Sequence, residues 1–150
     1  MQYWFHHLGV AVANLEAAIE WYDRVLGFAC IRRGHIPSAN ADMAMLQNGD
    51  LHVELLAYAD VRPASEERRV PDSDLQTCGN KHVSFACADV HALTAEIRAR
   101  GGDIVWVKDH GEGRANMFMR DLEGNLIEFI QTSPIAGGGF GALEQATVES

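Results

Sequence analysis

The stretch HLGVAVANLEAAIEWYDRVLG, residues 7–27, decides the fold because the chain repeats its pattern in HVSFACADVHALTAEIRARGG, residues 82–102. Each copy opens with His on a β-like run, reaches Asn14 or Asp89 seven residues later, and ends on Gly after a helical pattern. A later strand-like segment carries one Glu, 47 residues after the His in the first copy and 46 in the second. The chain is therefore a duplicated module with one imidazole and one carboxylate per copy.

The order of elements is the same in both copies. Asn and Asp are typical helix N-caps, and apolar residues recur after them at the spacing of one helix face. Strand-like segments follow each helix, at 28–32, 43–47 and 51–58 in the first copy and at 103–109, 116–121 and 125–132 in the second. The pattern predicts an α+β protein of two βαβββ modules rather than a doubly wound sheet.

The rest of the chain gives the boundaries. The first module covers 1–59 and the second 80–133. Residues 60–79 hold two prolines, many charges and no periodicity, which predicts an exposed linker. Residues 134–150 are rich in glycine and are predicted to form a flexible C-terminal tail.

Composition excludes several classes of protein. The net charge of −9 argues against nucleic-acid binding, which needs a basic surface. No apolar run approaches the roughly 20 residues that span a bilayer. The N-terminus lacks the pattern of a signal peptide, so a cytoplasmic protein is expected. Three cysteines without CxxC spacing predict reduced thiols.

Strand alternation predicts a metal site. His7, Glu54, His82 and Glu128 each lie on the strand face that points away from the helix of their module. If the modules curl into half-barrels, these faces line a shared concavity. Two carboxylates buried there without a partner are unfavourable, whereas a divalent ion of Zn, Ni, Co, Mn or Fe would bind both them and the imidazoles.

Other residues are candidates for contact with a substrate. His52 shares a strand face with the first Glu, and His110 lies in a loop that could cover the cavity. Arg114, in the glycine-flanked GEGRAN loop, is the best-placed cation for a substrate carboxylate or phosphate. His6 is expected to be a poor ligand, because in a regular strand it points away from the face of His7.

Four segments carry a resemblance to a known family: HHLGVAVANLEAAIEWYDRVLGF, HVELLAY, GNKHVSFACADV and RDLEGNLIEFIQ. The chain resembles the vicinal oxygen chelate superfamily over about residues 4–132. That superfamily includes glyoxalase I, methylmalonyl-CoA epimerase, extradiol dioxygenases, and fosfomycin and bleomycin resistance proteins. The resemblance implies paired modules that form a cupped, partly open mixed β-barrel around a divalent metal, often in a homodimer.

The ligand positions correspond one by one. His7 and Glu54 stand where the first module of glyoxalase I has its His and Glu, and His82 and Glu128 match the second-module pair. The set is most similar to that of glyoxalase I. Two features depart from the family: the linker differs from the loops expected around glutathione, and the usual DPDG turn reads DLEG at 121–124, a change expected to be harmless.

The resemblance implies a metal-dependent isomerase or lyase in which Glu128 or Glu54 removes a proton α to a carbonyl. An extradiol ring-cleaving dioxygenase with Fe(II) or Mn is the first alternative, although a fourth ligand would obstruct diol and oxygen. An antibiotic- or metabolite-binding resistance protein is the second, although such relatives usually lack the ligands. A homodimer with a small-molecule substrate is expected, and the site could lie within one chain or across two.

Overall fold

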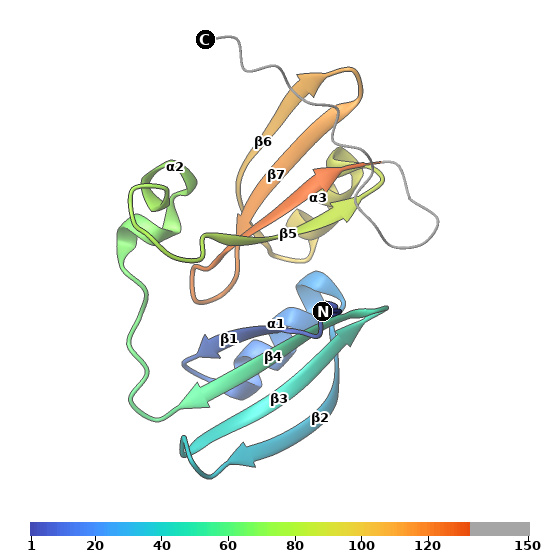
Figure 1. The fold of residues 1–150 in the computed structure, drawn as a ribbon. Coiled ribbons are helices and arrows are strands. Elements are labelled where there is room, and N and C mark those ends of the chain that lie inside the picture. The colour runs from blue at the N-terminus through green and yellow to red at the C-terminus, as the bar shows by residue number, and fades with distance from the viewer. Residues whose placement is uncertain (133–150) are drawn as a thin grey trace.

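The structure, a computed structural model, describes residues 1–132 as two βαβββ modules (Figure 1). The first contains β1 Leu8–Val12, α1 Leu15–Leu26, β2 Ala29–Ile36, β3 Ala41–Asn48 and β4 Leu51–Tyr58. The second contains β5 His82–Cys87, α3 Val90–Ala99, β6 Asp103–Gly111, β7 Arg114–Arg120 and β8 Leu126–Gln131. The predicted α+β duplication is confirmed, and the tail predicted at 134–150 lies outside the described residues.

Each module has one mixed sheet of four strands. The strand orders are β1-β4-β3-β2 and β5-β8-β7-β6, with parallel pairing of β1 with β4 and of β5 with β8. The two sheets stay separate within residues 1–132, so the fold is cupped and open rather than a closed barrel. β1 and β5 are edge strands, and each begins beside a candidate ligand histidine.

The predicted N-caps of both helices and the end of α1 are confirmed, whereas α3 ends at Ala99 with Arg100 as its C-cap, before the glycines at which its end was predicted. The side chain of Asn14 accepts a hydrogen bond from the backbone N–H of Ala17, and that of Asp89 accepts one from Ala92. Gly27 ends α1 with φ of 71°, a left-handed conformation that glycine adopts without steric cost. No helix in the described part of the chain is long and apolar enough to cross a membrane.

Burial alternates along β1, β4 and β5 as the sequence indicated, whereas Leu126, Ile127 and Glu128 of β8 are all buried. Val10 and Val12 are buried under α1, while Gly9 and Ala11 between them are exposed on the opposite face. On β4 and β5 the same alternation fixes the faces of Glu54 and His82, because a slip of one residue would move the apolar set into solvent. The hydrophobic clusters of the two modules share partly buried side chains, which join the modules: Trp21, Leu26 and Phe85.

The linker is more ordered than its sequence indicated. It contains a short 3-10 helix, η1 Glu66–Arg69, and one helical turn, α2 Pro71–Asp74. Asp74 is 1% exposed, and its carboxylate lies 3.2 Å from Nε of Arg68 and 3.3 Å from Nζ of Lys81. These two cations hold the linker against the start of β5.

The turn between β7 and β8 joins the two modules. The Asp121 carboxylate accepts hydrogen bonds from the Tyr22 hydroxyl at 2.9 Å and from the backbone of Glu123 and Asn125. The Glu123 carboxylate accepts one from the backbone N–H of Ala13 at 2.8 Å. The DLEG variant of the turn therefore keeps its Asp and adds a contact with the first module.

Replacing Tyr22 with Phe is expected to destabilise the protein. The Tyr22 hydroxyl is buried, and its loss leaves the Asp121 carboxylate without one donor, at a cost of about 1.5–3 kcal/mol. Urea unfolding near neutral pH measures the change, with the exposed Tyr58→Phe as the matched control. Equal stability of the two variants would contradict a structural role for the bond.

The same residue makes stability depend on alkaline pH. Burial first, and then the charge of Asp121, raise the pKa of Tyr22 well above 10.0. Its contribution is therefore complete below the unfolded-state pKa of about 10 and is lost as pH rises from there toward the folded-state pKa. The Tyr22→Phe variant should show a shallower loss of stability above about pH 10 than the unmodified chain, which unfolding curves at increasing pH would test.

Candidate metal centre

The first pair of candidate ligands lies at the edge between β1 and β4. The parallel ladder places Gly9 opposite Glu54, and His7 stands just before β1. Nε2 of His7 lies 3.4 Å from Oε2 of Glu54. Val53 and Leu55 on either side of the carboxylate are buried against the helix, so the Glu must point to the opposite face.

The second pair repeats this arrangement between β5 and β8. The ladder places Ser84 opposite Glu128, and His82 is the first residue of β5. Nε2 of His82 lies 3.3 Å from Oε2 of Glu128, and the imidazole packs edge-on against Phe118 with ring centroids 4.9 Å apart. Glu128 is only 9% exposed, so this carboxylate is the more buried of the two.

Both pairs fit a divalent metal. Two ligands at about 2.0–2.2 Å from one ion lie roughly 3–3.5 Å from each other, which matches the observed Nε2–Oε2 separations. Imidazole nitrogen with carboxylate oxygen suits the borderline transition-metal ions. The donors and their spacing are therefore those that two positions of a coordination shell require.

The two pairs are not joined within one chain. Across residues 1–132, the His, Cys, Asp and Glu side chains form no group of three or more that could hold an ion. The two pairs of candidate ligands are called the first half-site, His7 with Glu54, and the second half-site, His82 with Glu128. Two protein ligands leave at least half of a coordination shell to be supplied from elsewhere.

His6 lies nearer to the first half-site than expected. Its Nδ1 is 2.6 Å from Nδ1 of His7, and its ring stacks toward His52 with centroids 6.5 Å apart. The expectation that it points away from His7 was wrong, because β1 begins only at Leu8 and strand alternation does not extend to the residues before it. His52 is partly exposed on the face of Glu54, as the alternation predicted.

The remaining substrate candidates lie on β6 and β7. Arg114 begins β7, is exposed, and lies 3.8 Å from the Glu112 carboxylate, so it is only loosely held. His110 lies near the end of β6, where its Nε2 is 2.8 Å from Oδ1 of Asn116.

Asn116 is a site residue that sequence reasoning missed. Its Nδ2 donates a hydrogen bond of 2.7 Å to Oε1 of Glu128. The available signal was its position: it is the polar residue between the two terminal arginines of β7, two places before Phe118 and on the same face of the strand. A partly buried polar side chain at such a position needs a hydrogen-bond partner.

Aromatic side chains form a wall beside the second half-site. The rings of Trp106 and Phe118 have centroids 4.7 Å apart, and Nζ of Lys108 lies 4.1 Å from the Trp106 ring. The register of β6, β7 and β8 puts this wall on the face of Glu128. Such a wall can exclude water from one side of the half-site.

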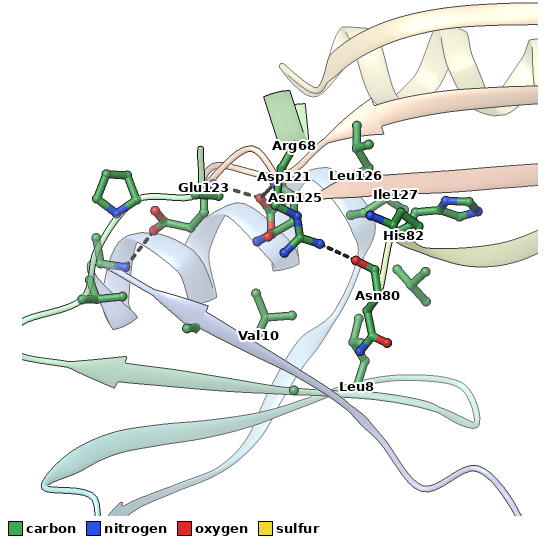
Figure 2. Close-up of a pocket in the computed structure, with 18 of the residues that line it drawn as sticks. Leu8, Val10, Arg68, Asn80, His82, Asp121, Glu123, Asn125, Leu126 and Ile127 are labelled. Carbon is green, nitrogen blue, oxygen red and sulfur yellow. Dashed lines mark hydrogen bonds between the residues drawn. The ribbon is translucent and has the colours of Figure 1, made fainter. Parts of the chain in front are cut away.

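A cavity of about 450 Å³ lies where the modules meet (Figure 2). Residues of β1, the linker, β5 and the β7–β8 turn line it, and His82 reaches it. Glu128 and the residues of the first half-site do not line it. The cavity is therefore a feature of the module junction that touches the candidate metal centre at one ligand.

Comparison with known proteins identifies one family over most of the chain. The model of the Glyoxalase/Bleomycin resistance protein/Dioxygenase superfamily matches residues 4–129. A lactoylglutathione lyase of Arabidopsis thaliana is 28% identical over 87% of this chain, which spans 44% of that relative. A lactoylglutathione lyase of Neisseria meningitidis is 26% identical over 83% of this chain and 88% of its own length.

The fold has solved counterparts as well. A glyoxalase family protein from Enterococcus faecalis superposes with a TM-score of 0.70 over 85% of this chain and 96% of its own, at 20% identity. The duplicated βαβββ modules, their paired His and Glu, and a family match over most of the chain lead to one conclusion. The chain belongs to the Glyoxalase/Bleomycin resistance protein/Dioxygenase superfamily, also called the vicinal oxygen chelate superfamily.

Proposed function

We propose that the protein is a divalent-metal-dependent enzyme of the glyoxalase type, a lyase or isomerase that shifts a proton α to a carbonyl of a small oxygenated substrate. The observation that carries the proposal is the pair of His and Glu in each module, at 3.4 Å and 3.3 Å. The relatives named lactoylglutathione lyase support it, since the Neisseria protein matches over most of its length.

The complete site is proposed to form between two chains. His7 and Glu54 of one chain would meet the partner's second half-site, which supplies the two missing ligands. Unpaired edges of β1 and β5, together with exposed Tyr3, Trp4 and Phe5, offer a surface that a second copy can cover. A twofold dimer would contain two such sites.

The residues have separate tasks in this proposal. The metal, when bound, supplies charge that polarises the substrate carbonyl. Glu54 or Glu128 accepts the α-proton and returns it to the neighbouring carbon. The wall of Trp106 and Phe118 excludes water, and Arg114 can reach toward an anionic part of the substrate.

The experiment combines metal analysis with proton exchange. The metal-loaded protein is incubated with lactoylglutathione in deuterated water, and NMR follows the hydrogen α to the thioester carbonyl. Exchange supports the proposal. Oxygen uptake with a catechol would instead favour ring cleavage, and a chain that binds no metal would favour sequestration of a ligand.

A homodimer is expected in solution. Sedimentation at micromolar concentration should give twice the 16.5 kDa of the chain, because each chain holds only half of each proposed site. A single species at 16.5 kDa under those conditions would contradict a site that is shared between chains.

A further inference from the structure

We propose that Asn116 and His110 are positioning residues for Glu128, which hold one carboxylate oxygen so that the other is turned toward His82. The inference concerns the carboxylate of the proposed metal centre and in that respect rests on the proposed function. The contacts themselves stand in the structure without a metal.

The three side chains form a continuous chain of hydrogen bonds. Nε2 of His110 lies 2.8 Å from Oδ1 of Asn116, and Nδ2 of Asn116 lies 2.7 Å from Oε1 of Glu128. A carboxylate only accepts, so the amide nitrogen must face it, and the amide oxygen must then face the imidazole. His110 therefore donates through Nε2 and fixes the direction of the amide.

The contact with Asn116 gives the two carboxylate oxygens of Glu128 different partners. Oε1 is bound to the amide, whereas Oε2 lies 3.3 Å from Nε2 of His82. The carboxylate is nearly buried, so few other partners compete for it. The bond to Oε1 restricts rotation of the Glu128 carboxylate, so metal binding would cost less conformational entropy. It also favours coordination of the metal through Oε2 alone.

The first module lacks this support. Met43 holds on β3 the place that Asn116 holds on β7, because each lies two residues before the strand neighbour of its module's Glu. A thioether cannot donate a hydrogen bond. Among the described residues, His7 is the side chain that contacts the Glu54 carboxylate. The duplication has therefore become asymmetric, with one fixed carboxylate and one freer carboxylate.

The test uses Asn116→Leu, His110→Ala and the double variant. Leu is close to Asn in size and has no donor, and thermal unfolding checks that each variant is folded. Zn²⁺ affinity is measured by competition with a chromophoric chelator, and Co²⁺ absorption reports the ligand geometry. Asn116→Leu should weaken metal binding about 10- to 100-fold and change the Co²⁺ spectrum, as loss of such support does elsewhere.

The double variant tests whether His110 acts on Glu128 through Asn116. If His110 acts only through Asn116, His110→Ala should give a smaller loss, and adding it to Asn116→Leu should change nothing further. His91→Ala is the matched control, because His91 is an exposed histidine of the same module with one partner, Asp109 at 2.9 Å. It should bind metal as the unmodified chain does.

Several results would overturn the proposal. Asn116→Leu with unchanged affinity and Co²⁺ spectrum would remove the role of Asn116, and additive losses would remove the link to His110. If the unmodified chain bound no metal, the proposed function would fail. NMR of the metal-free protein would then still test the contact between Asn116 and Glu128. Glu128→Gln should then shift the side-chain amide signals of Asn116, and unmoved signals would refute the contact.

Discussion

Replacing His82 with Ala is expected to remove most of the bound metal and leave the fold intact. The side chain is one of only two candidate ligands in its half-site, and its loss leaves Glu128 to bind the ion alone. It is 32% exposed, lies at the start of an edge strand and packs edge-on against one aromatic ring, that of Phe118, so the fold should survive its loss. Metal analysis after dialysis measures the loss, and circular dichroism checks the fold.

His35→Ala is the control for this variant. His35 is a strand histidine paired with a carboxylate, Asp42 at 2.8 Å, but the pair is exposed on the first module. Its removal should leave about one metal per chain. Full occupancy in His82→Ala would end the assignment of His82 as a ligand.

Mixing two inactive variants tests where the site lies. A chain with His7→Ala keeps the second half-site, and a chain with His82→Ala keeps the first. If the site is shared, random exchange of subunits should restore about a quarter of the sites, because half of the dimers then hold one intact site of two. No recovery after verified exchange would place all ligands in one chain and contradict the shared site.

Local sequence features predicted most of the fold. Asn14 and Asp89 accept the capping hydrogen bonds expected of them, and Gly27 ends its helix. Such features depend on neighbours within a few residues, so a sequence pattern shows them directly. The strand faces followed for the same reason, since alternation needs only one buried side.

The packing of the two modules against each other could not be predicted from local sequence features. It depends on packing of Trp21 and Phe85 and on the bonds that Tyr22 and Ala13 make with the β7–β8 turn. The two hydrogen bonds join residues 99 and 110 positions apart, and no local sequence pattern encodes contacts at such separations. The sequence therefore placed a candidate His and Glu of each module close together, as the structure has them, but left open whether the two pairs meet in one chain.

The hydrogen-bond and ion-pair partners of polar side chains also could not be predicted from the sequence pattern. The ordered linker rests on the buried Asp74, whose two cationic partners lie on different elements. Asn116 looked like one polar residue in a strand, and only the register of β7 with β8 gives it Glu128 as a partner. Side chains that act through a neighbour become visible once strand pairing is known.

Changing the proposed catalytic carboxylate to Gln should strongly reduce proton exchange while metal remains bound. Gln keeps the size of Glu and an oxygen that can ligate, but it cannot accept the α-proton at neutral pH. Removal of a general base typically costs about 10²–10⁴ in rate. The loss is measured separately in Glu54→Gln and Glu128→Gln as the rate at which the α-hydrogen of lactoylglutathione exchanges with deuterated water.

The two variants should differ because the two carboxylates are held differently. Glu128 is nearly buried and bound through Oε1 to Asn116, whereas Glu54 contacts His7 and is more exposed. One variant should therefore lose exchange and keep its metal, while the other should mainly lose metal, as the same dialysis assay would record. If Gln at both positions leaves exchange intact, the carboxylates are ligands only and another group moves the proton. If turnover instead requires oxygen, ring cleavage replaces proton transfer as the function of this site.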